Sequence, residues 1–361
     1  MSKLDEMCDS DKLKIQEYEI VGSLGSGAYG KVKMAKRIGE SDRQFVLKFI
    51  PIKNPSSPKH NTVDLATIYS EIAILQKIQT AGCVSDLLCY YDHFIDCSNP
   101  EIMYMIIVTL TFPNAIGLDK FIDKEITGIK SSLEDEINDL ETEKDDISDD
   151  LEVTEDEDEK ASLIKSFKRV TQKLKMVKDK LEQSSNIIPL SRNVLLTIFY
   201  NILHAIDKLH KLGIGHGDLK PENILINPKT YAIQIIDFGI SCMSDCKVSG
   251  TLLYDSPEIL DAIIHGSKKL FSVEELQKSD MFSLGLIFYK LANGELPSGQ
   301  SILKGQEYSG IPKLLDYYKT NLNSNRLFSM YNENSSPFDE KINTFIESIL
   351  IKRPDVSQLL D

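Results

Sequence analysis

This sequence of 361 residues has few long apolar runs and fewer Lys and Arg (41) than Asp and Glu (55). It also lacks closely spaced cysteines of the Cys-x-x-Cys type. The longest apolar run, from Ile102 to Phe112, is too short to span a bilayer, and it predicts a buried strand instead. The formal net charge of −14 argues against a general nucleic-acid binder and against a peripheral membrane protein held by basic residues. With 42% hydrophobic and 27% charged residues, the chain has the composition of a globular protein with an ordinary core.

The six cysteines, at positions 8, 83, 89, 97, 242 and 246, lack the Cys-x-x-Cys spacing of a metal site. We therefore expect free thiols in a reducing compartment. Because no signal-peptide pattern is visible either, the expected location is cytoplasmic or nuclear. Cys242 and Cys246, four residues apart, leave a redox pair open as the alternative.

The negative charge is local. Residues 131–159 hold 16 Asp and Glu against Lys144 alone, whereas residues 160–182 hold 8 Lys and Arg against two acidic residues. Apolar residues recur at spacings of three and four through both segments, at Leu133, Ile137, Leu140, Ile147, Leu151, Leu163, Phe167, Val170, Leu174, Val177 and Leu181. This pattern predicts an antiparallel helical hairpin over about 124–188. Its functional interpretation is a docking or dimerisation arm, and the alternative is a solvated insertion that is partly disordered.

The stretch from His216 to Ile226 is the one around which the rest of the chain is organised. Pro221 cannot continue a helix or donate a backbone hydrogen bond, so the polar residues around it are expected in a loop before a short strand. Asp218 can accept a proton from an attacking hydroxyl or orient it. Lys220 can neutralise a negative charge that develops nearby, and Asn223 offers an uncharged oxygen suited to magnesium. These residue types predict a catalytic loop.

A glycine-rich turn near the N-terminus joins two predicted strands. It runs from Gly25 to Gly30 and follows the strand-like segment from Tyr18 to Leu24. Such a turn lets backbone N–H groups approach phosphate oxygens without obstruction by side chains. A dinucleotide site would need a helix after the third glycine, but Val32 and the next apolar run, Phe45 to Ile50, indicate sheet. The alternative to a phosphate-binding turn is a plain tight hairpin.

Two charged residues lie in or at the end of predicted strands, Lys48 and Asp237. Lys48 lies inside an apolar strand, where an unpaired ammonium is costly to desolvate. Its most economical partner is Glu71, in a segment with helical period, and a nucleotide phosphate would be the second. The alternative is that Lys48 extends to water at a strand end. Asp237, fourteen residues after Asn223, ends another predicted strand and is followed by Phe238 and glycine, a natural place for a metal-binding carboxylate.

Taken together, these motifs resemble those of eukaryotic-type protein kinases, whose catalytic loop reads His-Arg-Asp-Leu-Lys-x-x-Asn. Gly217 stands here in place of the arginine. Ser256-Pro257-Glu258 resembles the Ala-Pro-Glu sequence that ends the kinase activation segment. The resemblance implies that Glu258 forms an ion pair with Arg353 and that Asp280 braces the backbone of the catalytic loop.

The resemblance also implies the fold class and the domains. The expected fold is α+β and bilobal, with a small β-rich N-lobe and a larger helical C-lobe that carries a charged helical-hairpin insertion. An N-terminal arm would occupy 1–16, the N-lobe 17–112 and the C-lobe 113–361, with the coiled-coil-like insertion at 124–188 inside the C-lobe.

The activity implied by the resemblance is transfer of the ATP γ-phosphoryl group to serine or threonine hydroxyls of protein substrates, with ATP and Mg²⁺ as cofactors. Lys220 and Thr251 are typical of serine/threonine kinases. Asp218 and Lys220 would be catalytic, and Asn223 and Asp237 would hold the metal. The residues implied to bind ATP are Leu24, Gly25, Ser26, Gly27, Ala28, Tyr29, Gly30, Lys31, Val32, Lys48 and Glu71. The implied partners are a protein substrate and, through 124–188, a further protein or a second copy, without nucleic acid or membrane.

Two other functions stay open. A small-molecule phosphotransferase can share His-Gly-Asp with a later asparagine, although the complete glycine turn and the Ser256-Pro257-Glu258 segment argue against it. A pseudokinase scaffold that acts through the helical insertion would usually lack one of three residues, Lys48, Asp218 or Asp237, and all three are present. Gly217 further predicts that activity does not need phosphorylation of the activation segment, because glycine cannot hold a phosphate as arginine does.

Overall fold

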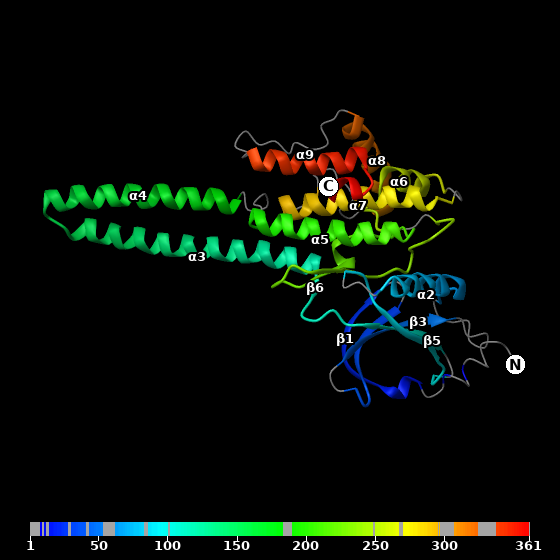
Figure 1. Ribbon diagram of the computed structural model, residues 1–361. Coiled ribbons are helices and arrows are strands. Elements are labelled where there is room, and N and C mark those ends of the chain that lie inside the picture. The colour runs from blue at the N-terminus through cyan, green and yellow to red at the C-terminus, as the bar shows by residue number, and fades with distance from the viewer. Residues whose placement is uncertain are drawn as a thin grey trace.

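The computed structural model describes residues 8, 11, 14–27, 30–40, 43–52, 62–82, 86–99, 102–182, 190–247, 250–266, 270–294, 296, 307–323 and 337–360 (Figure 1). Most of the expected arm at 1–16 lies outside these ranges, as does the end of the expected insertion, 183–188. The strands are β1 (Tyr18–Gly27), β2 (Gly30–Arg37), β3 (Gln44–Ile52), β4 (Tyr90–Asp96), β5 (Met103–Leu110), β6 (Ile116–Gly117), β7 (Ile224–Ile226) and β8 (Ile233–Ile235). The helices are η1 (Lys14–Glu17), α2 (Leu65–Thr80), α3 (Leu118–Val153), α4 (Glu157–Glu182), α5 (Arg192–Lys211), η3 (Pro221–Asn223), α6 (Pro257–Ile264), α7 (Val273–Asn293), α8 (Glu307–Asn323), α9 (Pro337–Lys352) and α10 (Ser357–Leu360).

An antiparallel five-stranded sheet forms the N-terminal part, with strand order β1-β2-β3-β5-β4. Side chains along β3, the central strand, alternate between the two faces of the sheet. Phe45, Leu47 and Phe49 face a small apolar core together with Tyr18 and Phe94. Lys48 is therefore turned to the opposite face, on the side of α2. The predicted strands and the helix after them are confirmed.

The remainder of the chain is mostly helical, so the α+β composition is confirmed. Helices α5, α7 and α9 pack against one another beside the sheet (Figure 1). Helix α5 buries an apolar stripe made of Leu195, Phe199, Ile202, Ile206 and Leu209. Phe199 stacks on Phe288 of α7 with ring centroids 3.9 Å apart. Within the described ranges, no helix is long and apolar enough to cross a membrane.

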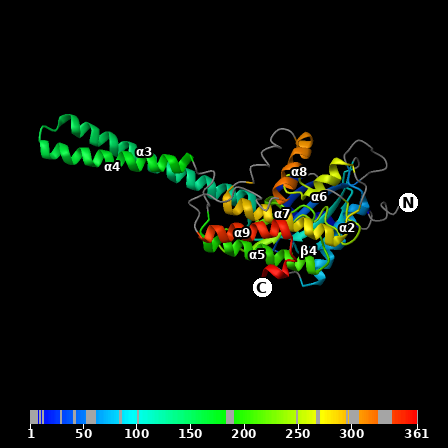
Figure 2. The same cartoon turned by 90° about the horizontal axis from the view of Figure 1, so that it is seen from above.

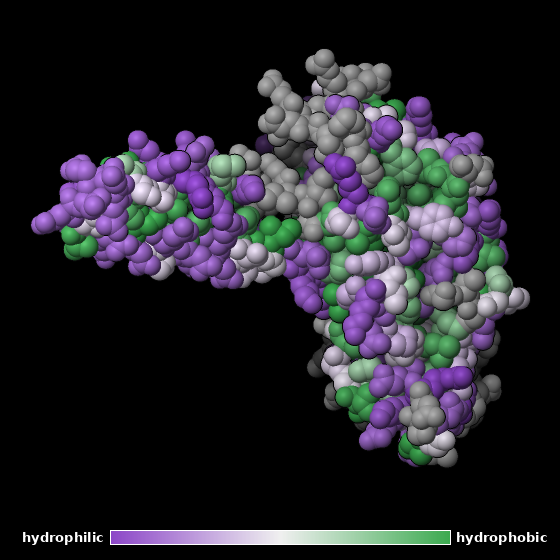
Figure 3. Space-filling model, turned by 60° about the vertical axis from the view of Figure 1, so that its left-hand side comes forward, coloured by the Kyte–Doolittle hydropathy of each residue, from purple (hydrophilic) through white to green (hydrophobic). Residues whose placement is uncertain are grey.

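A long helical hairpin, α3 and α4, projects from the helical part (Figures 1 and 2). Its two helices bury an apolar seam of their own, made of Ile137, Leu140, Val170, Leu174 and Val177. Lys173 pairs with Glu136, and Lys178 pairs with Glu141, at 3.1 and 2.6 Å. The face of the hairpin seen in Figure 3 is mostly hydrophilic, with smaller apolar patches. Because α3 is continuous from Leu118, the first half of the hairpin is an extension of a helix rooted in the body.

The expectation of free thiols is wrong for the described cysteines. Disulfides join Cys8 to Cys97 and Cys242 to Cys246, and Cys89 is also disulfide-bonded. The fold brings the first pair together across 89 residues of sequence, with Cα atoms 5.8 Å apart, a separation that a disulfide can bridge. Spacing along the chain could not predict this contact. The argument for a reducing compartment rested on free thiols and loses that support.

The predicted ion pair between Glu258 and Arg353 is present. Glu258 lies in the first turn of α6, and Arg353 directly follows α9. The Arg353 guanidinium also lies over the ring of Phe282, 5.1 Å from its centroid. Its side chain is only 17% exposed, so this pair fixes the start of α6 to the C-terminal helices.

We expect Glu258→Gln to lower the free energy of unfolding by about 2 kcal/mol, because Arg353 stays largely buried and loses its charged acceptor. Urea-induced unfolding followed by circular dichroism measures this change. Glu340→Gln, at an exposed position of α9, is the matched control and should leave stability unchanged. Equal stability of the two variants would contradict the importance of the pair.

Candidate active site

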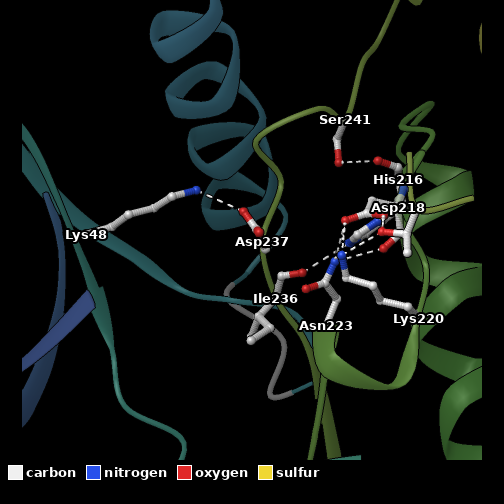
Figure 4. Close-up of polar contacts among 9 residues, drawn as sticks. Lys48, His216, Asp218, Lys220, Asn223, Ile236, Asp237 and Ser241 are labelled. Carbon is white, nitrogen blue, oxygen red and sulfur yellow. Dashed lines mark hydrogen bonds and ion pairs between the residues drawn. The ribbon is translucent and has the colours of Figure 1, made fainter. Parts of the chain in front are cut away.

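An ammonium group connects the sheet to the helical part at the centre of the site. Lys48 Nζ on β3 donates to Glu71 Oε1 on α2 at 2.7 Å. It also donates to Asp237 Oδ1 at 2.8 Å, the contact that Figure 4 shows. The predicted pairing of Lys48 with Glu71 is confirmed, and the alternative of a lysine extended to water is wrong. The contact with Asp237 was not predicted, because it joins residues 189 positions apart.

Two opposing effects act on the pKa values of these groups. Burial would lower the pKa of Lys48, but the charges of Glu71 and Asp237 outweigh burial and raise it. Burial would likewise raise the pKa of Asp237, but the Lys48 ammonium and its hydrogen bond hold that pKa below the usual range. The pair therefore carries full opposite charges at neutral pH.

A buried carboxylate braces the backbone of the catalytic loop. Asp280 of α7 is 1% exposed and accepts hydrogen bonds from the backbone N–H groups of His216 and Gly217, both at 2.8 Å. His210 Nε2 of α5 lies 3.0 Å from the same carboxylate. The bracing role that the resemblance implied for Asp280 is confirmed. The loop that carries Asp218 is thereby fixed to two helices.

A threonine hydroxyl lies between the two residues predicted to be catalytic. Thr251 Oγ1 donates to Asp218 Oδ1 at 2.6 Å, and Lys220 Nζ donates to Thr251 Oγ1 at 2.7 Å. Lys220 Nζ is also 2.8 Å from Asp218 Oδ2. Asn223 Nδ2 donates to Asp218, both to its backbone oxygen at 2.8 Å and to Oδ2 at 3.1 Å. Figure 4 shows Asp218, Lys220 and Asn223 gathered at one place in the loop. This arrangement can hold an alcohol group against a carboxylate and an ammonium.

Gly217 has a backbone conformation that excludes most other residues. Its φ is +80°, and a Cβ placed there would lie 3.4 Å from the oxygen of Ile240 and 3.5 Å from Cδ2 of Leu276. These distances are ordinary van der Waals contacts, so the positive φ, and not a lack of space, is what favours glycine at 217.

The glycine-rich turn joins β1 and β2, and the last residue pair between these antiparallel strands is Gly27 with Gly30. Gly30 has φ +147°, and a Cβ there would meet the oxygen of Phe49 at 2.0 Å, so only glycine fits against β3. Leu24 is 51% exposed at the rim. Of the other residues implied to bind ATP, Gly25 and Ser26 lie on β1, Lys31 and Val32 lie on β2, and Ala28 and Tyr29 lie outside the described residues. Val32 lies opposite Lys48 in the β2–β3 register.

Asn223 and Asp237 have the donor atoms for magnesium. Asn223 uses its amide nitrogen for Asp218, which leaves the amide oxygen for a cation, and the Asp237 side chain is 38% exposed. Magnesium prefers such oxygen ligands and often completes its shell with water and substrate phosphates. Among the described residues, no group of three or more His, Cys, Asp or Glu could hold a metal ion unaided. The two residues thus fit a magnesium ion that is shared with phosphates.

Asp255 is a buried acid that sequence reasoning did not single out. It is 5% exposed, and its Oδ2 has no hydrogen-bond partner among the described residues. Burial, followed by the nearby charge of Asp218, raises its pKa from 3.8 to about 7, although Lys220 opposes the shift. A polar residue between Tyr254 and the Ser256-Pro257-Glu258 segment was the only signal that could have indicated it.

Comparison with known proteins supports the resemblance. The family model of the protein kinase domain matches residues 123–360, well over half of the chain. "Probable serine/threonine-protein kinase iksA" of Dictyostelium discoideum is 26% identical over 211 residues, which cover 51% of this chain and 21% of that protein. "Ovarian-specific serine/threonine-protein kinase Lok" of Drosophila melanogaster is 33% identical over 138 residues, or 34% and 28% of the two chains. "Serine/threonine-protein kinase nekl-2" of Caenorhabditis elegans is 32% identical over 171 residues, or 46% and 42%. The matched segments thus span less than half the length of each relative.

We expect stability to fall as pH rises through the window set by Asp255. Between about pH 4 and pH 7 the unfolded chain loses a proton that the folded chain keeps, so the free energy of unfolding decreases. Asp255→Asn should remove this decrease, which is at most about 4 kcal/mol. Thermal unfolding at pH 5 and pH 8 tests it, with exposed Asp316→Asn as the control. Parallel pH profiles for wild type and Asp255→Asn would contradict the expectation.

Proposed function

Because the chain belongs to the protein kinase domain family, we propose that it is an ATP-dependent serine/threonine protein kinase. Its two parts would be the lobes of the bilobal kinase fold, with 17–112 as the N-lobe, 113–361 as the C-lobe and 124–188 as an insertion. The observation that carries the proposal is the hydroxyl of Thr251, held by Asp218 at 2.6 Å and by Lys220 at 2.7 Å. A substrate hydroxyl needs the same two partners.

In the proposed mechanism, each polar group of the site has one task. Lys48, held by Glu71, would bind the α- and β-phosphates of ATP, and the backbone of the glycine-rich turn would cover them. Asn223 and Asp237 would hold magnesium, which supplies positive charge against the phosphates when bound. Asp218 would orient the substrate hydroxyl and accept its proton. Lys220 would neutralise charge that grows on the transferred phosphoryl group.

Thr251 has a second consequence for the mechanism. Its hydroxyl occupies the hydrogen-bonding positions of Asp218 and Lys220, and it lies on the segment before the buried Ser256-Pro257 pair. This contact holds the segment close to the catalytic loop.

Asp218→Asn should lower kcat by about a hundredfold or more, because the amide cannot accept the proton. Nucleotide affinity should stay within about threefold, because Lys48 and Asp237 are untouched. The measurement is phosphoryl transfer from labelled ATP, together with calorimetric titration of ATP and magnesium. Asp150→Asn, an exposed change on α3, is the control and should keep full activity.

The same assay, run with a casein-like protein and with a panel of amino-sugars, tests the substrate class. Transfer to protein alone supports the proposal. Transfer to amino-sugars alone would indicate a small-molecule phosphotransferase. ATP binding without transfer to either, with cellular function kept by Asp218→Asn, would indicate a pseudokinase scaffold.

Activity should not require phosphorylation of the activation segment, because Gly217 supplies no guanidinium to bind a phosphate. Ser241 is buried and donates to the backbone oxygen of His216 at 2.7 Å, so its hydroxyl already has a structural role. Phosphatase treatment that clears Ser241, Ser244, Thr251 and Ser249, which lies outside the described residues, should change kcat/KM by less than about twofold. Loss of most activity after this treatment, restored by rephosphorylation, would show that the prediction is wrong.

A further inference from the structure

The segment after Asp237 contains a disulfide that the proposed mechanism does not use. Cys242 and Cys246 are bonded, with Cα atoms 5.6 Å apart. We call this bond the segment disulfide. It closes a short loop through Met243, Ser244 and Asp245, of which Ser244 and Asp245 are exposed.

Each end of the segment disulfide is fixed to a different part of the body. The backbone of Cys242 exchanges two hydrogen bonds with Gly215, each 3.0 Å, directly before the catalytic loop. The backbone of Cys246 exchanges two hydrogen bonds with Phe271, at 2.8 and 2.9 Å, directly before α7. The disulfide therefore sets the distance between two anchoring points, one beside His216 and one beside α7.

An apolar cluster surrounds the segment disulfide. Its buried members are Cys246, Ile259, Ala262, Phe271 and Leu276, and Cys242 packs against them. Leu276 belongs to both this cluster and the packing around Gly217, where it lies 3.5 Å from the position of a Cβ. Through Leu276, the apolar cluster around the disulfide reaches the catalytic loop beside Gly217.

We infer that the segment disulfide is a redox switch: when bonded it holds the segment after Asp237 against the catalytic loop, and when reduced by a dithiol it releases the segment. Its effect on activity rests on the proposed kinase function. In the bonded state the structure has Lys48 paired with both carboxylates and Asp218 in contact with Thr251. The backbone pair of Cys242 with Gly215 supports the catalytic loop from the residue directly before it, so reduction loosens this support and lowers activity.

The reduction step balances with one dithiol, such as dithiothreitol. Cys242 is half-buried whereas Cys246 is 1% exposed, so the attacking thiolate reaches Cys242 Sγ first. A mixed disulfide forms there, and the electron pair of the broken bond leaves on Cys246 Sγ, which takes up a proton. The second thiol of the dithiol then displaces Cys242 Sγ, which is protonated in turn. Two electrons and two protons pass to the protein, and the dithiol becomes a cyclic disulfide.

Three variants and three readouts test the switch in the full chain. Alkylation and mass spectrometry before and after dithiothreitol should report Cys242 and Cys246 as blocked and then free. Reduction should lower kcat/KM about fivefold and raise hydrogen exchange at 241–247, because the loop constraint is lost. Cys242→Ser and Cys246→Ser should have the kcat/KM and hydrogen exchange of the reduced wild type, and dithiothreitol should not change either value. The double change Cys8→Ser with Cys97→Ser removes the distant disulfide and should keep the full response.

Two results would overturn the inference. One is free alkylation of Cys242 and Cys246 in protein purified without reductant. The other is a reduced protein whose hydrogen exchange at 241–247 is unchanged. If the chain transfers no phosphate in either state, the proposed function fails, and the alkylation and exchange results still decide whether the switch exists.

Discussion

The burial of one positive charge controls how the two parts of this protein meet. Lys48 lies on the face of β3 turned away from the small apolar core, with its side chain 17% exposed. An ammonium in that position needs compensation, and two carboxylates from separate elements provide it. Glu71 comes from α2 beside the sheet, whereas Asp237 follows β8 in the helical part. The Lys48 side chain therefore connects the sheet to α2 and to the end of β8.

The catalytic loop depends on a second buried charge, of the opposite sign. Asp280 accepts two backbone N–H groups of the loop, one of them from Gly217, whose φ is +80°. A glycine at that position removes the steric cost of this backbone conformation. Helix α7 thus holds the backbone of the loop through Asp280, and Thr251 contacts the Asp218 side chain. Contacts of Asp280, Asn223, Lys220 and Thr251 hold the loop in the conformation that the structure shows.

Local pattern was enough to predict the strands, the helix with Glu71 and the loop with Asp218, because each rests on periodicity or on residues close in sequence. The Lys48–Glu71 pair was predictable since desolvation demands a partner and few candidates existed. Spacing along the chain could not predict the contacts of Thr251 or the disulfide between Cys8 and Cys97, because the packing of whole elements brings these residues together. The burial of Asp255, whose Oδ2 has no hydrogen-bond partner among the described residues, depends on the same packing. The expectation of free thiols was wrong for Cys8 and Cys97 for this reason, whereas the bond between Cys242 and Cys246, four residues apart, agrees with the pair that the sequence left open.

The hairpin of α3 and α4 shows how charge separation can specify an extended structure. Each helix alone is too strongly charged to collapse onto the body, since acidic residues dominate α3 beyond Ile129 and basic residues dominate α4. Paired with each other, the helices bury a continuous apolar seam and match opposite charges at Lys173–Glu136 and Lys178–Glu141. Such exposed pairs contribute little stability individually, so the seam provides most of the stability and the charges select the partner helix. The unpaired acidic residues near the turn at Thr154 remain on the outer surface. The hairpin therefore projects from the body with its apolar seam covered by its own two helices (Figures 1 and 2).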